Sequence, residues 1–164
     1  MSIIKIAKGD YMNEDALERV ITHYVYPPAL VIGGLGVDPH HAVEQMKMAK
    51  EMWGQTGGKQ LHHFILRFSD WESSRLENSI KKIEELAYRI CELFSHEHQI
   101  VFGIHDDGAI HVHFVLNSVN YRTGHKFVHK NRDDYFLADY IHDFIFPNTI
   151  GSKFSTGRIP VYYY

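Results

Sequence analysis

The chain has 164 residues, of which 45% are hydrophobic and 13% aromatic, and its formal net charge at pH 7 is −3. This length is enough for a single domain, residues 1–164, with a real hydrophobic core, whether it is complete or the N-terminal part of a longer chain. The slightly negative charge excludes a uniformly basic polyanion-binding protein. A local basic strip could still contact nucleic acid.

A single cysteine, Cys91, excludes a disulfide framework and fits a reducing compartment. No apolar run reaches the length of a membrane span, and the N-terminus lacks the profile of a signal peptide. We therefore expect a cytoplasmic protein without membrane insertion. The 13 histidines stand out, because histidine is the commonest metal ligand and a natural general base near neutral pH.

Residues 2–7 predict an opening strand, and apolar residues at helical spacing predict a helix from Asn13 to Tyr26. Tyr24 falls in the last turn of that helix, where periodicity alone favours a role in core packing. Residues 29–38 are rich in glycine but contain no phosphate-binding motif, so they suggest a mobile linker or lid.

Residues 39–52 predict a second helix, and residues 60–68 a strand with His63 and Arg67 on one face. Ser69 or Asp70 can cap one long helix that continues to Leu93. Residues 133–146 predict a further helix, and residues 158–164 a final strand.

Two β-rich runs, residues 99–105 and 110–119, flank an Asp-Asp-Gly turn and predict a hairpin. His111 and His113 are two residues apart and project from the same face of a strand. With a three-residue loop, His105 pairs with His111 and all three imidazoles share that face; with a two-residue loop, His105 points away. Gly108 suits the left-handed position of the three-residue loop.

Three histidines on paired strands predict a metal site, and Asp106 is a catalytic candidate that could orient one of them. The alternative is that the histidines form only the polar face of a strand. Because hairpin-connected strands exclude an all-parallel sheet, we expect an α+β fold: a central antiparallel sheet with helices packed on one face, the other face being free for the histidines.

The segment after Asn120 is the most basic of the chain and is punctuated by aromatic residues, a pattern suited to phosphates and unstacked bases. A solvated turn explains it equally well. Its candidate DNA-binding residues are Arg122, Lys126, Lys130 and Arg132.

The chain resembles the relaxases, the mobilisation nucleases of the HUH endonuclease superfamily, from about Ile3 to Phe127. The strongest part is His-Asp…His-Val-His-Phe-Val-Leu-Asn-Ser-Val-Asn, followed by Tyr-Arg-Thr-Gly-His-Lys-Phe. The segment from Ala42 to Phe68, with its glycine-rich break and His63, is also similar to family sequence. Several blocks in the family order make the resemblance specific.

The resemblance implies a two-layer relaxase fold in which a tyrosine attacks single-stranded DNA at a transfer origin and forms a 5′-phosphotyrosine. It assigns the nucleophile to Tyr24, with Tyr26 in the same segment as the alternative, and the metal ligands to His105, His111 and His113. It implies Mg²⁺ or Mn²⁺ as cofactor and a DNA contact just before Phe68, where Arg67 stands.

The partners implied are single-stranded or hairpin origin DNA, relaxosome accessory proteins and a type IV secretion coupling protein. Two other functional classes remain open. One is a catalytically inactive relaxase-fold protein that binds DNA or organises a relaxosome. The other is a metalloenzyme that uses the three histidines on a substrate other than nucleic acid.

Overall fold

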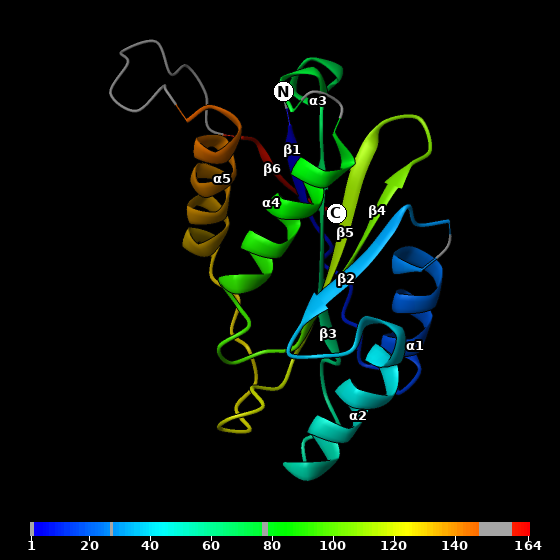
Figure 1. The fold of residues 1–164 in the computed structure, drawn as a ribbon. Helices are drawn as coiled ribbons and strands as arrows, with labels where there is room; N and C mark the ends of the chain where they lie inside the picture. Colours follow the sequence, from blue (N-terminus) through cyan, green and yellow to red (C-terminus); the bar gives the residue numbers. More distant parts are fainter. Residues whose placement is uncertain (1, 27, 77–78, 148–158) are drawn as a thin grey trace.

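The computed structural model describes residues 2–26, 28–76, 79–147 and 159–164. Within these residues, six strands form one sheet in the order β2-β4-β5-β3-β1-β6 (Figure 1). The strands are β1 (Ile3–Ile6), β2 (Val31–Leu35), β3 (Leu61–Arg67), β4 (Ile100–Asp106), β5 (Ile110–Asn117) and β6 (Val161–Tyr163). The helices are α1 (Ala16–Val20), the π-helix η1 (Ile21–Val25), the 3₁₀ helix η2 (Pro39–His41), α2 (Ala42–Met52), α3 (Asp70–Arg75), α4 (Ile80–Glu92) and α5 (Asn131–Ile145).

The predicted α+β class is confirmed, and all neighbouring strands pair antiparallel except β6, which pairs parallel to β1. The final strand therefore makes the sheet mixed. It was predicted for residues 158–164, of which Arg158 lies outside the described residues. A parallel partner could not be foreseen locally, because nothing in three residues of strand encodes the direction of the neighbour.

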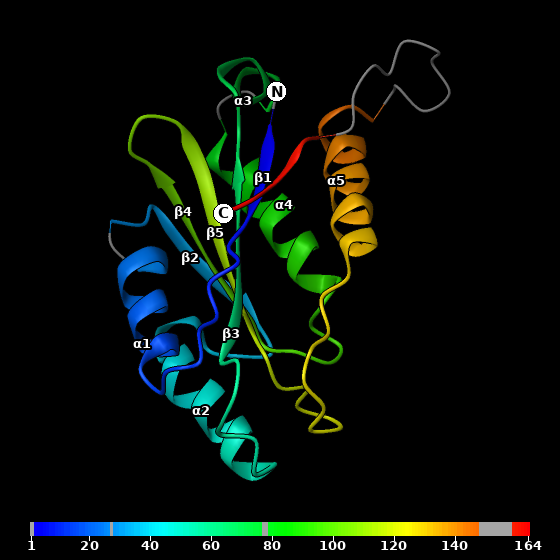
Figure 2. The ribbon, with the colours of Figure 1, turned by 180° about the vertical axis from the view of Figure 1, so that it is seen from behind.

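Two buried apolar clusters lie on opposite faces of the sheet, because side chains alternate along each strand. Phe114 on β5 belongs to the larger cluster under α4 and α5, whereas the next residue, Val115, belongs to the smaller cluster under α1, η1 and α2. Figures 1 and 2 show these two groups of helices on either side of the sheet. The expectation that helices cover one face only was wrong in this respect. The second helical layer exists because both α1 and α2 carry an apolar side to bury.

The glycine-rich segment is an edge strand, β2, and not the predicted linker or lid. It pairs with β4, with Gly33 opposite Phe102. A Cβ added to Gly33 would overlap the ring of Phe102 and would lie 2.8 Å from the hydroxyl oxygen of Tyr88. Glycine is therefore required by close packing, and not by flexibility.

The predicted long helix after β3 is divided into α3 and α4. Ser69 caps α3 through a capping box with Glu72, and Ser79 caps α4 by accepting from the backbone N–H of Lys82. Each half thus has its own start signal. No helix in the described part of the chain is long and apolar enough to cross a membrane.

Candidate active site

The hairpin of β4 and β5 has the three-residue loop that brings the histidines together. Asp106 pairs with Ile110, and His105 pairs directly with His111, which leaves residues 107–109 as the loop. Gly108 has φ +115°, a backbone conformation that side chains with a Cβ rarely adopt. His105, His111 and His113 consequently share one face of the sheet, as predicted from the odd loop length.

The three imidazole rings are mutual neighbours. Ring centroids lie 5.4 Å apart for His105 and His111, 5.3 Å for His105 and His113, and 5.1 Å for His111 and His113. His105 and His113 are buried, and His111 is half-buried, so the cluster forms a shallow centre open on the side of His111.

The donor set fits a metal ion in its chemistry. The Nε2 atom of His105 is buried without a hydrogen-bond partner. His111 uses Nδ1 toward the carbonyl oxygen of Ala109 (2.9 Å), and His113 uses Nδ1 toward Nε2 of His63 (2.9 Å), so each can offer Nε2 to an ion. Among the described residues, however, no three His, Cys, Asp or Glu side chains are already spaced to hold one. Binding would require the three rings to turn their Nε2 atoms toward a common point.

His63 on β3 is a fourth histidine of this centre. It is 3% exposed, its ring stacks on that of His113 at 5.2 Å, and its Nδ1 lies 3.4 Å from the hydroxyl of Tyr11. Burial lowers the pKa of His63 to about 4 and, together with the neighbouring histidines, that of His113 to about 3. Both rings are therefore neutral near pH 7, which is the form that ligates metals.

Tyr24 is brought to the histidines by η1. Its ring centroid lies 5.7 Å from that of His113 and 5.4 Å from that of His63, and 48% of the residue is exposed. The close approach of η1 to the sheet depends on Gly103, which pairs with His113 in register. A Cβ at Gly103 would overlap the carbonyl oxygen of Val25. A π-helical turn is uncommon, and such turns are frequent at functional sites.

Tyr24 and Tyr26 have different environments. The hydroxyl of Tyr26 donates to the carbonyl oxygen of Pro39 (2.7 Å), and burial raises the pKa of Tyr26. Tyr26 thus ties η1 to η2, whereas Tyr24 faces the histidines. Periodicity alone had favoured a core position for Tyr24, but its half-exposed ring is not part of the core.

Asp106 lies one residue beyond His105, so its side chain projects to the opposite face of the sheet. The carboxylate beside the histidines is that of Asp107, whose Oδ1 is 3.5 Å from Nδ1 of His111. This placement favours Asp107 over Asp106 as the acidic neighbour of the centre.

The candidate DNA-binding residues fall into two places. Arg67 pairs with His111 in register, is exposed, and stands on the histidine face. Lys126 instead donates to the carbonyl oxygens of Gly57 and Lys59, at the far end of β3. The other three lie toward the α5 side: Arg122 beside a cavity of about 370 Å³, Lys130 at the N-cap of α5, and Arg132 in an ion pair with Asp133.

Three residues of the centre were not singled out from the sequence as functional: His63, Tyr11 and Gly103. His63 was assigned to a strand face shared with Arg67, and that face is the histidine face. This pattern could have indicated His63, had the pairing of β3 with β5 been known. Tyr11 (φ +46°) and Gly103 carry no local signal, because their roles arise from contacts with residues far along the chain.

The α+β sheet and its histidine hairpin define a domain of the relaxase class. The family described as "Relaxase: MobA/VirD2-like, nuclease domain" matches residues 28–144. The chain is 30% identical over 94 residues to a protein of Staphylococcus aureus named Protein rlx, covering 57% of this chain and 27% of that protein. A second Staphylococcus aureus protein of the same name is 27% identical over 116 residues, which cover 70% of this chain and 34% of that protein.

The chain therefore belongs to the MobA/VirD2-like relaxase nuclease family. It spans about a third of the length of these relatives. The family match includes all four histidines of the centre and Arg67, but it begins after Tyr24. No solved structure matches the chain significantly.

Proposed function

We propose that this domain is a metal-assisted nickase and strand transferase for single-stranded DNA, with Tyr24 as nucleophile. The observation that carries the proposal is the placement of Tyr24 against His113 and His63, on the same face as His105 and His111. In this proposal the nick at a plasmid or transposon origin of transfer starts conjugative mobilisation.

In the proposed reaction the hydroxyl of Tyr24 loses its proton, and its oxygen bonds to the phosphorus of one phosphodiester. The bond from phosphorus to the 3′-oxygen breaks, and that oxygen takes up a proton to become a free 3′-hydroxyl. The 5′-phosphotyrosine preserves the ester, so the reverse reaction can rejoin the strand. Because Tyr24 is half-exposed, its proton can leave to water.

An unperturbed tyrosine has a pKa of about 10 and is a weak nucleophile at pH 7, so the phosphate has to be made more electrophilic. A divalent ion at the histidine centre would withdraw charge from the non-bridging phosphate oxygens. The residues to hold it are His105, His111 and His113. Imidazole ligands suit Zn²⁺, Fe²⁺ or Ni²⁺, whereas Mg²⁺ and Mn²⁺ prefer oxygen ligands, which the phosphate and water would add to the three histidines.

Other residues of the face would position the reacting groups. Arg67, opposite His111 in register, can hold a DNA phosphate near the centre. The hydrogen bond from His63 would fix the ring of His113, and the carbonyl oxygen of Ala109 would do the same for His111, with Asp107 as the nearby carboxylate. Asp106, Arg122, Lys126, Lys130 and Arg132 keep their sequence-based assignments only as weaker proposals, because they lie away from this face. Relaxosome and coupling-protein partners would engage the domain through the DNA complex.

The test is covalent adduct formation. The chain is incubated with Mn²⁺ and single-stranded DNA carrying its own origin, and adducts are separated from free protein on a denaturing gel. We expect an adduct with the natural chain and with Tyr26→Phe, and none with Tyr24→Phe, since the loss of the nucleophilic oxygen leaves nothing to bond to phosphorus.

An adduct with Tyr24→Phe would overturn the assignment of the nucleophile. DNA binding that is independent of metal, with no adduct from the natural chain, would instead support the inactive DNA-binding protein. Metal-dependent hydrolysis of a small ester, equal in Tyr24→Phe and the natural chain, would support a metalloenzyme of another kind.

A further inference from the structure

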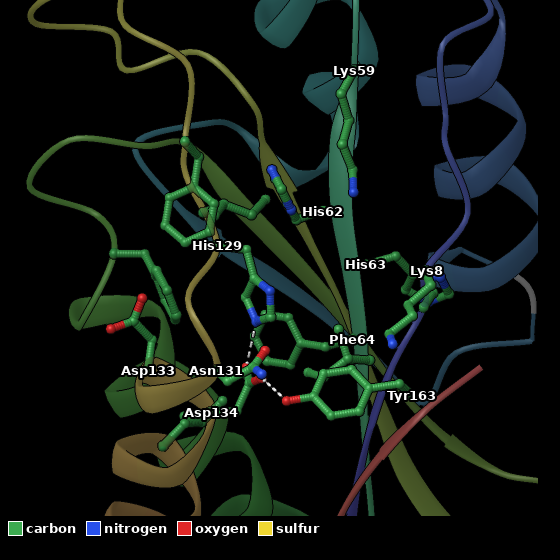
Figure 3. A pocket seen from close by; sticks show the side chains of 16 residues that line it. Lys8, Lys59, His62, His63, Phe64, His129, Asn131, Asp133, Asp134 and Tyr163 are labelled. Carbon is green, nitrogen blue, oxygen red and sulfur yellow. Dashed lines mark hydrogen bonds and ion pairs between the residues drawn. The ribbon is translucent and has the colours of Figure 1, made fainter.

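A second cavity, of about 270 Å³, lies between the sheet and α5, on the face that carries Phe64 and Leu116 (Figure 3). It is bounded by β1, β3 and β6 on one side and by the beginning of α5 on the other. Its walls include the aromatic rings of Phe64, Phe94, Phe127 and Tyr163. Apart from His63, none of its lining residues has a part in the proposed reaction.

A buried polar cluster fixes one wall. Asp134 is 4% exposed, and its two carboxylate oxygens are engaged by the hydroxyl of Tyr163 (2.6 Å) and by Nε2 of His129 (2.7 Å). This cluster joins α5 to β6 and to the segment before α5. A buried carboxylate with both oxygens paired holds its neighbours in one geometry, so the wall is preformed.

Cationic side chains line one side of the cavity, and acidic and amide side chains line the other. Lys8 and Lys59 stand on the side of the strands, and Asn131, Asp133 and Asp134 stand on the side of α5 (Figure 3). The ammonium of Lys8 lies 4.5 Å from the ring centroid of Tyr163, so a cation and an aromatic face are presented together.

We propose that this cavity binds one unstacked nucleotide. Its base would stack against the aromatic wall, its phosphate would face Lys8 and Lys59, and the polar edge of the base would face Asn131 and Asp133. A nucleotide has both a flat apolar ring with hydrogen-bonding edges and a separate anionic group, which is the division that this lining shows. An uncharged apolar ligand would leave the lysines unused, and inorganic phosphate would leave the aromatic wall unused.

The inference that the cavity holds a base of the nicked DNA strand rests on the proposed function. Lys8 follows β1 and lies one residue from Ala7, whose backbone N–H donates to the carbonyl oxygen of His63. His63 also lines the cavity. His62 and His63 are adjacent on β3 and project to opposite faces, so this one strand separates the cavity, beside His62, from the histidine centre, which includes His63.

The experiment is a titration of the ¹⁵N-labelled chain, followed by amide shifts, with deoxyadenosine monophosphate and, in parallel, with a short single-stranded oligonucleotide. We expect saturable shifts at Lys59, His62, Phe127, His129 and Asn131. The double variant Lys8→Gln/Lys59→Gln should bind about tenfold more weakly, because two charge-assisted contacts are lost. The matched control is Lys47→Gln/Lys81→Gln, which removes the same charge from α2 and α4.

Saturable shifts with the mononucleotide, with a lower affinity in the double variant, would show that the cavity binds a free nucleotide. The same shifts with the oligonucleotide only would support the proposal for a base of a strand. The proposal is overturned if neither probe shifts these residues, or if inorganic phosphate does so as tightly as the mononucleotide. Tyr24→Phe separates the two proposals, because it should abolish the adduct and leave the nucleotide shifts unchanged.

Discussion

The two faces of the sheet carry different kinds of side chain, although the same strands supply both. On β5, Val112, Phe114 and Leu116 point into the large core beneath α4 and α5, while His111 and His113 point the other way. The smaller core, under α1, η1 and α2, covers only part of the other face and leaves Tyr24 and Arg67 exposed beside the histidines.

The comparison indicates that one face mainly stabilises the fold and that the other carries the candidate active site. The face under α4 and α5 carries the larger apolar cluster, which supplies most of the buried apolar surface that holds the fold together. On the other face, the smaller cluster packs η1 against Gly103. The imidazole rings of the histidine centre lie next to this cluster and are not part of it. Three predictions test how independent the two faces are.

The largest effect should come from acid, because both faces bury neutral histidines. Burial lowers the pKa to about 3 for His62, on the face of the large core, to about 4 for His63 and to about 3 for His113. In the unfolded chain each titrates near 6.5, so unfolding takes up protons between pH 6.5 and about 4 for His63 and between pH 6.5 and about 3 for His62 and His113. The stabilisation is complete above pH 6.5 and is lost as the pH falls, by roughly 1.4 kcal/mol per group per pH unit.

The measurement is urea unfolding of the metal-free chain at pH 7, 6 and 5. His62→Leu should flatten the dependence on pH, because it removes one of the buried neutral histidines. A free energy of unfolding that is unchanged from pH 7 to pH 5 would refute the buried, neutral state of these histidines.

The next effect should come from Gly103→Ala. The added Cβ overlaps the carbonyl oxygen of Val25, so η1 must move away from the sheet and carry Tyr24 with it. We expect a loss of about 3 kcal/mol in the free energy of unfolding and a loss of adduct formation. Gly57→Ala is the matched control: its Cβ meets nothing within 4 Å, and stability should change by less than about 0.5 kcal/mol. Equal stability and adduct yield in the two variants would show that η1 does not need this close contact.

The smallest effect compares two adjacent histidines on opposite faces. His63→Leu removes the hydrogen bond to His113 and should weaken Mn²⁺ binding about 10- to 100-fold, measured by calorimetry, because the ligand ring is no longer oriented. His62→Leu should leave the affinity for Mn²⁺ unchanged. His63→Gln should restore part of it, since its amide can still donate. If His62→Leu and His63→Leu weaken Mn²⁺ binding equally, His63 has no special role in orienting the ligand.

Sequence reasoning worked best where the controlling contacts were local. The hairpin and the strand around His63 followed from residue type and period, and the register of β4 with β5 then selected the three-residue loop from the two that the sequence allowed. Reasoning failed at β2, where glycines that normally signal a loop are required by the rings packed on them. It also failed to predict that helices pack on both faces of the sheet, because the sequence of an amphipathic helix does not indicate against which face of the sheet its apolar side packs.

The sequence by itself determined that His111 and His113 share a face, because strand alternation is a property of neighbouring residues, and it limited His105 to two loop lengths, of which the pairing of His105 with His111 selects one. Only the tertiary structure decided that Tyr24, and not Tyr26, faces them, that His63 holds His113, and that most of the basic segment lies away from this face. The physical reason is that each of these facts depends on contacts between residues distant in the chain, and such contacts are set by the packing of helices on the sheet.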